Sequence, residues 1–451
     1  MFDTMTLRQK LIAIAAVSLA VHIIVIAFLT HLGDPEYWPR IMSIVDSGNG
    51  IYGLDGNYYT PVWGYMLSCL DMVLHFLGLV PHLGNVFTEL LGWGAVSVAN
   101  PQVISPQIVL ATKIPLAVVD IIVGFQLYGI VKEFTGSEKK GMLAMAMWCF
   151  CPMVIYMSGV QGQFDCISTM LALATIRLLR ADKILIAGMA FGLSVWLKLF
   201  PSVCLFLFVG YLISKYGTKA GIQKTIIAAA GALAVSVVLL IPMIMNGEVD
   251  IAFGFFTGRM NTTTDSGFYN KLVSVRLILM ILLTLVLMVF SFLGIKRRGE
   301  DADRYLYLYA GVLISVATII SRGYQYVPSF IPFVLLFAMI SNDKRSYTWM
   351  FWFFGIVTMI DAFFSPGPSI FAIPAVYYGM IDATWLQDIT IAFLETVGHN
   401  GAYPVGYIFA VSWAVLLWVF VIVAISDLLE DIHPKLKHKL EKFRNIGGEK
   451  E

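Results

Sequence analysis

Acidic side chains at the ends of long apolar segments are the first candidates for chemistry. Asp34 follows the first apolar run by about four residues, in the sequence Gly33-Asp34-Pro35-Glu36. A carboxylate at the mouth of a helix bundle can act as a general base that deprotonates a hydroxyl group. The same residue also suits an ordinary loop or a helix N-cap before Pro35. Both interpretations stay open at this point.

A second acidic position closes the segment Gln161-Gly162-Gln163-Phe164-Asp165, which separates two apolar runs. The polar side chains of Gln161 and Gln163 point into an interface between apolar helices. A carboxylate near a helix N-terminus is favoured by the helix dipole. Asp165 is therefore an alternative general base, and a helix cap within a tight turn is the structural interpretation.

Basic side chains within apolar segments indicate a site for an anion. Lys113 and Asp120 are seven residues apart and so share one face of a helix. Lys113 would reach a phosphate near the outer end and Asp120 would lie deeper, unless the two form a buried structural pair. Other cations interrupt apolar or outer segments, at Lys198, Arg259, Lys271 and Arg322. Each could extend to lipid headgroups, but together they predict a cavity for an anionic ligand, phosphate in particular.

The composition defines the class of protein that must position these groups. The chain has 451 residues, of which 59% are hydrophobic and 13% charged. Soluble domains carry about 25% charged residues. The sequence thus predicts an all-α polytopic membrane protein, a single integral membrane domain over residues 1–451, with no nucleic-acid partner. Its five cysteines mostly lie in apolar runs and lack zinc-site spacing, which favours buried free thiols.

Apolar runs predict about twelve spanning helices. They cover residues 11–30, 106–131, 141–158, 164–181, 184–199, 200–214, 225–246, 273–295, 305–321, 324–341, 347–364 and 404–427. The basic linkers between them, together with the basic N-terminus and the charged tail 428–451, predict cytoplasmic termini by the positive-inside rule. The linkers in question are 132–140, 180–183, 214–224, 296–304 and 342–346.

Twelve spans require that the apolar segment 61–80 does not cross the membrane. We expect it to lie along the outer surface as an interfacial or re-entrant helix. The region 81–105 contains no basic residue, and the aromatic side chains of Tyr59, Trp63 and Tyr65 suit an interface. Residues 31–105 would then form one long outer loop with juxtamembrane helices. Outer loops are also expected at 247–272 and 365–403.

The pattern resembles the glycosyltransferase C (GT-C) superfamily, whose members are polytopic enzymes that use lipid-phosphate-linked sugars. The resemblance covers residues 11–340, leaving the C-terminal helices 341–427 without a family motif. Three elements are the acid after the first helix, the loop ending Tyr58-Tyr59-Thr60-Pro61 and the Lys113/Asp120 pair. The fourth is the block that runs from Pro152 through Gln161–Asp165 to Lys198-Leu199-Phe200-Pro201. The fifth is Arg322-Gly323-Tyr324-Gln325-Tyr326-Val327-Pro328. The block is similar to one in prokaryotic members, GPI mannosyltransferases and ER N-glycan glucosyltransferases. Cys151 replaces the usual asparagine before Pro152.

The resemblance implies an inverting hexosyltransferase, with mannosyl transfer among the reactions it suggests. A monosaccharide would move from a polyprenyl-phosphate donor to an acceptor on the outer membrane face. Asp34 or Glu36 would be the base, with Asp165 as the alternative. Arg322 would stabilise the leaving lipid phosphate, with Lys198, Lys113 and Arg259 as further candidates.

Sugar or acceptor contacts implied by the same resemblance come from aromatic and amide side chains. They are Tyr58, Tyr59, Trp63, Gln161, Gln163, Asn261, Tyr269, Asn270, Gln325 and Tyr326. The scheme requires no cofactor and no metal. The acceptor would be a glycan, a lipid or a protein, and membrane lipids would surround the enzyme.

The compact chain and the form of its Gln161–Asp165 motif favour a prokaryotic plasma membrane and a role in the cell envelope. The competing class is a secondary transporter or lipid flippase. A transporter should show internal symmetry and paired broken helices, whereas the polar positions here gather on the predicted outer side.

Overall fold

The computed structural model describes residues 5–32, 34–46, 48–53, 60–78, 87–89, 102–251, 268–321, 323–341, 345–397 and 404–430. Twelve helical segments correspond to the predicted spans. They are α1 (Leu7–Phe28), α4 (Pro106–Thr135), α5 (Glu138–Cys149) with α6 (Pro152–Ile155) and the π-helix η4 (Tyr156–Gln161), α7 (Asp165–Arg180), α8 (Ile184–Leu197), η5 (Phe200–Cys204) with α9 (Leu205–Tyr216), α10 (Thr218–Met245), α12 (Phe268–Lys296), α13 (Ala302–Ser321), η7 (Tyr324–Tyr326) with α14 (Val327–Ile340), α15 (Arg345–Phe364) and α18 (Pro404–Glu430).

Shorter elements occupy the predicted outer loops. They are α2 (Asp34–Asp46), α3 (Pro61–Phe76), η8 (Gly367–Phe371), α16 (Ala372–Val376) and α17 (Ala383–Thr396), with the turn η6 (Gly299–Asp301) between α12 and α13. Strands β1 (Phe87–Glu89) and β2 (Gln102–Ile104) pair antiparallel, with Phe87 opposite Ile104. The all-α polytopic prediction is confirmed, with this short ribbon as a local addition.

Six of the described helices are long and apolar enough to cross a membrane, or seven if the bent pair α5 and α6/η4 counts as one span. The bend in that pair is 47°. It falls at Cys151-Pro152, where proline lacks the amide hydrogen that would continue the helix. The remaining apolar helices are shorter because they too are interrupted, as at Pro201 and at Gly323. The count of twelve spans therefore stays a prediction.

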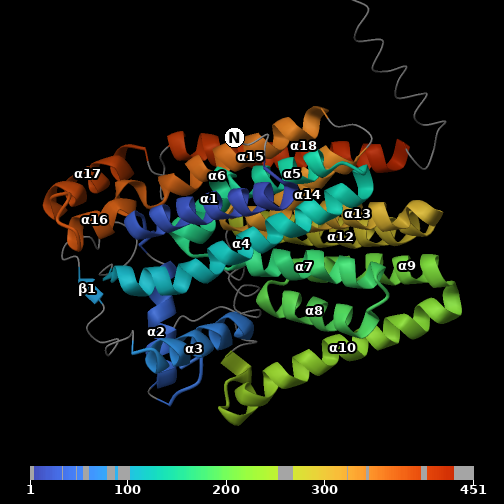
Figure 1. The fold of residues 1–451 in the computed structure, drawn as a ribbon, viewed down its shortest axis with the longest axis horizontal. Coiled ribbons are helices and arrows are strands. Elements are labelled where there is room, and N and C mark those ends of the chain that lie inside the picture. The colour runs from blue at the N-terminus through green and yellow to red at the C-terminus, as the bar shows by residue number, and fades with distance from the viewer. Residues whose placement is uncertain are drawn as a thin grey trace, which may run out of the picture.

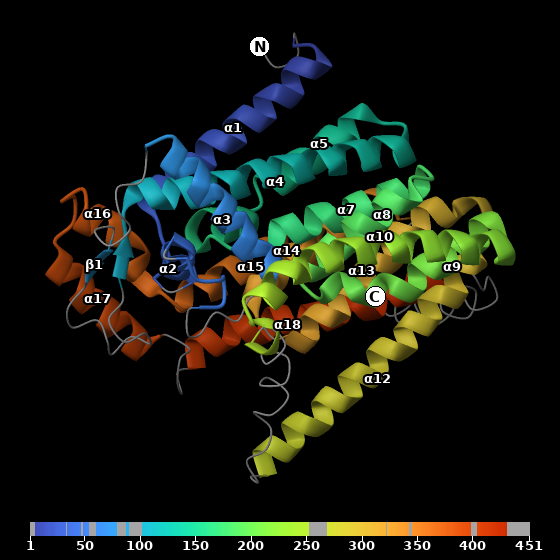
Figure 2. The same ribbon diagram turned by 90° about the horizontal axis from the view of Figure 1, so that it is seen from below.

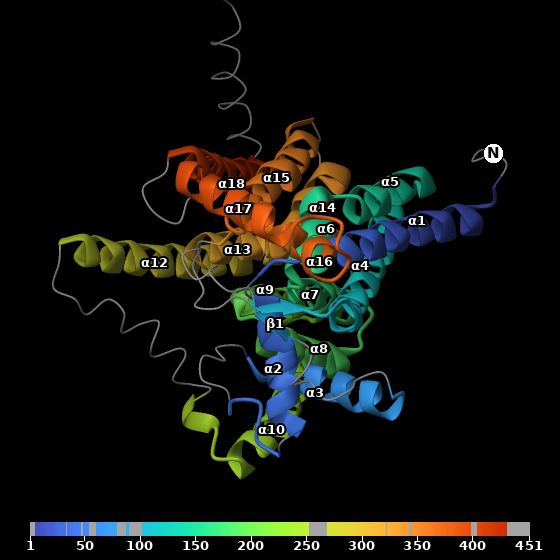
Figure 3. The same ribbon diagram turned by 90° about the vertical axis from the view of Figure 1, so that its left-hand side faces the viewer.

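The long helices run side by side along one axis, and the short elements gather at one end of it. Figure 1 shows α2, α16, α17 and β1 at the left end of the bundle, with α2 across the bundle axis. Figure 2 shows α1 and α12 diverging from the body on opposite sides. Figure 3 looks onto the end formed by α2, α3, α16 and α17. This end is the one that the basic linkers predict to be outer.

The predicted cytoplasmic end is held by ion pairs among the basic linkers. Arg180 pairs with Glu133 in the last turn of α4 and with Asp303 in α13, at 3.2 Å for the latter. Lys215 of α9 also lies 3.7 Å from Asp303. Four linkers that are distant in sequence therefore meet at one end, as the positive-inside argument requires. The charged tail from residue 431 lies outside the described residues.

The core lies around α13 and α14. Every residue of α14 is buried, as are most of those in α13. Leu306, Leu313 and Phe333 are completely inaccessible. An apolar helix that is buried on all sides belongs at the centre of a bundle, so these two helices form the scaffold against which α7 and α15 pack.

A buried polar contact joins α1 to α4. His22 Nε2 lies 3.6 Å from Asp120 Oδ2, and both side chains are buried. Nδ1 of His22 lies 2.8 Å from the carbonyl oxygen of Ser18, and Trp148 donates to the carbonyl oxygen of Asp120. Asp120 therefore contacts α1 rather than Lys113. Ionisable groups at such depth are costly unless they interact with each other.

We predict that His22 and Asp120 are energetically coupled. A double-mutant cycle of His22→Ala and Asp120→Ala should give a coupling of about 0.5–3 kcal/mol, as for buried residues in contact. Reversible unfolding by detergent denaturation measures the free energies. The matched control is the pair Asp71 and His75, 3.4 Å apart with His75 41% exposed, which should couple by less than about 1 kcal/mol. Equal coupling in the two pairs would contradict the prediction.

Candidate active site

A π-helical turn shapes the centre of the candidate site. The wider turn of η4 ends at Gly162, which adopts φ 66°. A Cβ atom at Gly162 would lie 3.1 Å from Cε of Lys113. Only glycine adopts this backbone without strain and leaves this space. Single π-helical turns are frequent at functional sites, and this one places Gln161 and Gln163 on either side of a sharp reversal.

The buried side chain of Lys113 holds the backbone of this turn by hydrogen bonds. The side chain is fully buried. Its ammonium group donates to the carbonyl oxygen of Val160 at 2.6 Å and to the hydroxyl of Thr30 at 3.2 Å. The backbone amide of His31 also donates to Val160. Lys113 therefore connects α4, the end of α1 and η4, and it does not pair with Asp120.

An ion pair between Asp165 and Lys198 forms the charged part of the site. Asp165 begins α7, Lys198 caps the end of α8, and the Nζ–Oδ2 distance is 3.2 Å. Asp165 is fully buried, whereas the Lys198 side chain is 12% exposed. Ser329 of α14 donates to the other carboxylate oxygen of Asp165 at 3.5 Å. The carboxylate thus orients a lysine that stays partly accessible.

Aromatic rings surround the Lys198 ammonium group. Nζ lies 4.6 Å from the ring centroid of Phe164 and 5.1 Å from that of Tyr326. Tyr326 also packs edge-on against Phe200, at 4.9 Å between centroids. A cation over ring faces is attracted by their quadrupoles. The Tyr326 segment and the end of α8, two separate elements of the GT-C resemblance, therefore meet at one lysine.

A stack of aromatic rings extends from this lysine toward α2 and α3. Trp63 is stacked on Phe164 at 4.8 Å with an interplanar angle of 17°. Trp38 meets Trp63 edge-on at 5.5 Å and donates to the carbonyl oxygen of Gly162 at 3.1 Å. The contact binds α2 directly to the Gln161–Gln163 turn. Sequence reasoning did not select Trp38 as a site residue, and the density of aromatic residues near it in the sequence was the available signal.

The first outer loop reaches the same place through Thr60. Its hydroxyl donates to the carbonyl oxygen of Leu197, the residue before Lys198, at 2.7 Å. Thr60 is the N-cap residue of α3. The motif that ends in Thr60-Pro61 therefore lies beside Lys198, although 137 residues separate Thr60 from Leu197.

Glu248 anchors an earlier part of the same loop, and sequence reasoning did not select it. Its carboxylate accepts a hydrogen bond from the backbone amide of Tyr52 at 2.8 Å. A Cβ atom at Gly50 would lie 2.1 Å from the Glu248 carboxylate. The acid is 5% exposed. Its position just after a long apolar helix, in Asn246-Gly247-Glu248, was the signal that could have revealed it.

Several predicted site residues lie outside the described residues: Tyr58, Tyr59, Arg259, Asn261 and Arg322. Asp34 and Glu36 fall in the first turn of α2, and Tyr269 and Asn270 in the first turn of α12, with only their backbone described. Gln161 and Gln163 are each 2% exposed at the turn, and Gln325 lies in η7 next to Tyr326. The structure thus brings together Gln161, Gln163, Asp165, Lys198, Trp63 and Tyr326.

No cluster of three or more histidine, cysteine, aspartate or glutamate side chains suited to a metal occurs within the described ranges. The groups present are one ion pair, amides and aromatic rings. Such a set can bind an anion and a polar ring that has an apolar face.

Comparison with known families gives a match over about two fifths of the chain. Residues 101–280 match the model of glycosyltransferase family 87. This is a GT-C-type family. The match indicates a membrane-embedded glycosyltransferase, and it confirms the resemblance drawn from the motifs. The matched segment contains Lys113, the Gln161–Asp165 turn and Lys198, while Trp63 and Tyr326 come from outside it. No curated protein sequence matches the chain.

We predict that Gly162→Ala destabilises the protein more than Gly136→Ala. The two glycines have nearly equal φ, 66° and 65°, so each alanine costs about 1–2 kcal/mol for the left-handed backbone. A Cβ at Gly136 meets open space, whereas one at Gly162 crowds Lys113. Overpacking should add roughly 1–3 kcal/mol. Thermal unfolding in one detergent measures the difference, and equal losses would show that the Lys113 contact carries no cost.

Proposed function

We propose that the protein is an inverting glycosyltransferase that moves a monosaccharide from a polyprenyl-phosphate donor to an acceptor hydroxyl. The observation that carries the proposal is the oriented Lys198, held between Asp165 and the rings of Phe164 and Tyr326. It lies within the segment that matches a glycosyltransferase family. In this proposal the reaction takes place at the outer face of a prokaryotic plasma membrane, and the distribution of basic linkers supports that orientation.

Lys198 stabilises the leaving group in this proposal. Departure of the lipid phosphate moves negative charge onto a phosphate oxygen. A cation that is already oriented in a water-poor site stabilises that charge more strongly than water does. Asp165 sets the position of the ammonium group, and Arg322, four residues before Tyr326, supplies a second cation. Arginine suits phosphate because its donors can bind two oxygens together.

Asp34 is the general base in this proposal. It accepts the proton of the acceptor hydroxyl while the hydroxyl oxygen bonds to the anomeric carbon. The bond from that carbon to the phosphate oxygen breaks on the opposite side, and its electron pair leaves with the phosphate. Asp34 begins α2 one helical turn before Trp38, which is bonded to Gly162. Asp165 is the weaker candidate because it is buried and paired with a lysine, which stabilises its deprotonated form.

The sugar lies between the amide groups and the aromatic stack in this arrangement. Gln161 and Gln163 supply donors and acceptors for ring hydroxyls. Trp63 and the tyrosines that precede Thr60 supply apolar surface for the face of the ring. The polyprenyl chain extends along the apolar helices. A donor and acceptor panel identifies the sugar and the glycan, lipid or protein acceptor.

The reaction itself is tested with purified full-length protein and a panel of polyprenyl-phosphate hexoses. We expect slow release of sugar to water, transfer to an added acceptor, and inversion of the anomeric configuration by NMR. An absence of turnover with the whole panel, combined with solute flux into proteoliposomes, would favour a transporter.

We predict that Lys198→Ala lowers kcat by roughly 10²–10³, the usual effect of removing one group that stabilises developing charge. Lys132→Ala is the matched control, since Lys132 pairs with Glu138 on an exposed linker, and its activity should equal that of the unmodified protein. Transfer rates with labelled donor measure both. An unchanged rate in Lys198→Ala would remove this lysine from the phosphate site.

We predict that Asp34→Asn and Asp165→Asn impair different steps of the reaction. Asp34→Asn should abolish transfer but leave donor affinity unchanged, because only the proton acceptor is lost. Asp165→Asn should weaken donor binding as well, because Lys198 loses the carboxylate that orients it. Donor titration and single-turnover rates separate the two effects. Full transfer by Asp34→Asn would exclude it as the base.

A further inference from the structure

An apolar cavity of about 200 Å³ lies between α7, α8, α9 and α10, apart from the candidate active site. Leu179, Phe191, Phe208 and Leu212 line it, together with the smaller Ala228 and Ala229 of α10. Two of its lining residues, Ala229 and Leu205, are exposed on the surface of the bundle. The cavity is therefore open toward the side of the protein that faces the bilayer.

Close packing of α8 against α10 explains why space is left beside α9. A Cβ atom at Gly188 would lie 1.9 Å from the carbonyl oxygen of Ala228, and one at Gly231 would lie 2.3 Å from that of Leu185. Glycine contacts of this kind bring two helix backbones together. Ala229 of α10 and Phe208 of α9 both line the space that remains. Apolar cavities of roughly this size stay dry and take apolar ligands.

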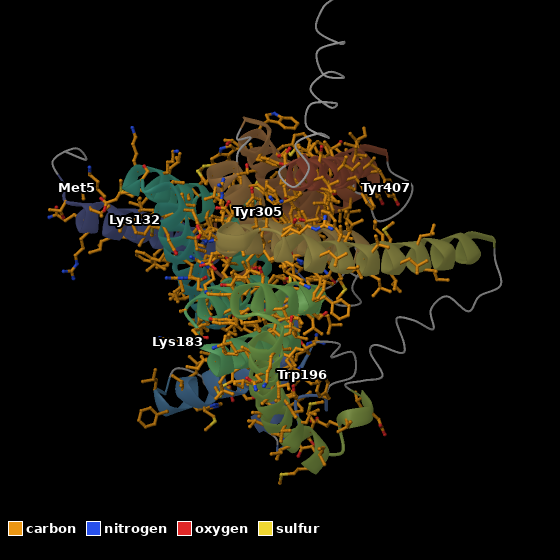
Figure 4. All side chains as sticks on the ribbon, turned by 90° about the vertical axis from the view of Figure 1, so that its right-hand side faces the viewer. Met5, Lys132, Lys183, Trp196, Tyr305 and Tyr407 are labelled. Carbon is orange, nitrogen blue, oxygen red and sulfur yellow. The ribbon has the colours of Figure 1, made fainter. Side chains whose placement is uncertain are left out.

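Basic linkers border one end of this cavity. The lining residue Leu179 precedes Arg180, and the lining residue Thr225 follows Lys224. Figure 4 views this end of the bundle and labels Lys183, the N-cap residue of α8. Lys183 and Lys219 are exposed, and no ion pair within the described ranges involves either. They are the cations available to an external anion.

Linkers 180–183 and 214–224 contain one acidic residue, Asp182, and it already has hydrogen-bond partners. Asp182 accepts hydrogen bonds from Lys224 at 2.5 Å and from the Tyr216 hydroxyl at 2.9 Å. The hydrogen bond from Lys224 holds the pKa of Asp182 below its usual value. Asp182 therefore stays ionised and neutralises Lys224. Lys183 and Lys219 keep an uncompensated positive charge at the rim.

We infer that this cavity and its basic rim bind an anionic phospholipid, with one acyl chain in the cavity and the phosphate near Lys183 and Lys219. The apolar cavity is complementary to a hydrocarbon chain, and the two lysines at its rim are complementary to a negatively charged headgroup. Basic pockets between membrane helices bind anionic headgroups by the same combination. This lipid site lies at the predicted cytoplasmic end and is independent of the proposed transfer reaction.

The headgroup contact is tested by native mass spectrometry of the full-length protein with phosphatidylglycerol or phosphatidylcholine. We expect tighter binding of phosphatidylglycerol. Lys183→Gln combined with Lys219→Gln should weaken it by roughly fivefold per lysine, since each basic residue near a charged surface contributes about 1 kcal/mol. Lys139→Gln with Lys140→Gln, an equal change of charge on another exposed linker, should have no effect. Equal weakening by both double variants would overturn the proposal.

The chain contact is tested by filling the cavity. Ala229→Leu should reduce phosphatidylglycerol binding at least as strongly as the lysine changes. Ala230→Leu is the matched control, because Ala230 is exposed on the same helix but does not line the cavity. Phosphatidylglycerol binding that survives in Ala229→Leu would overturn the proposal, as would an equal preference for phosphatidylcholine. Stronger competition by polyprenyl phosphate than by phosphatidylglycerol would assign the cavity to the donor chain instead.

Discussion

The ion pair between Asp165 and Lys198 is the interaction on which the arrangement of the site depends. A single buried charge within a membrane protein is costly, and a partner within hydrogen-bonding distance offsets that cost. The two residues lie at adjoining ends of α7 and α8, so the pair requires these helices to end at the same level. Reciprocal hydrogen bonds between Ser168 and Ser194 hold the helices in that register.

The scaffold around the pair is built so that α7 cannot shift independently. Thr169 donates to the carbonyl oxygen of Pro328 at the start of α14, and Ser329 donates to Asp165. Because every residue of α14 is buried, these contacts attach the charged pair to the core of the bundle. The outer elements then attach to this fixed point, α2 through Trp38 and α3 through Thr60.

The ion pairs at the two ends of the bundle have different surroundings and different roles. At the predicted cytoplasmic end, basic linkers form ion pairs with acids on neighbouring helices and so fasten the helix ends. At the other end, the pair of Asp165 and Lys198 is largely buried and its lysine lies over aromatic rings. An exposed ion pair contributes little to stability, whereas an oriented cation in a water-poor site can act strongly on a substrate. The candidate chemistry and the proposed lipid site therefore lie at opposite ends.

Much of the architecture followed from the sequence. Apolar runs located the helical segments, since each must satisfy its own backbone hydrogen bonds in the bilayer. Interruptions by polar groups located Asp165 and Lys198, and the basic linkers grouped at one end as expected. The Gln161–Asp165 and Lys198 motifs also carried the resemblance that the family match then confirmed. These features depend on local composition and order along the chain.

Only the tertiary structure decided which polar groups meet. Lys113 and Asp120 share a helix face, yet Lys113 bonds to Val160 whereas Asp120 faces His22. Helices that are apolar on most sides have no polar face to indicate which side meets which neighbour, since lipid and protein interior are similarly apolar. The pairing of Thr60 with Leu197 and of Glu248 with Tyr52 likewise joins segments far apart in sequence. Such contacts arise from helix packing, which local sequence does not encode.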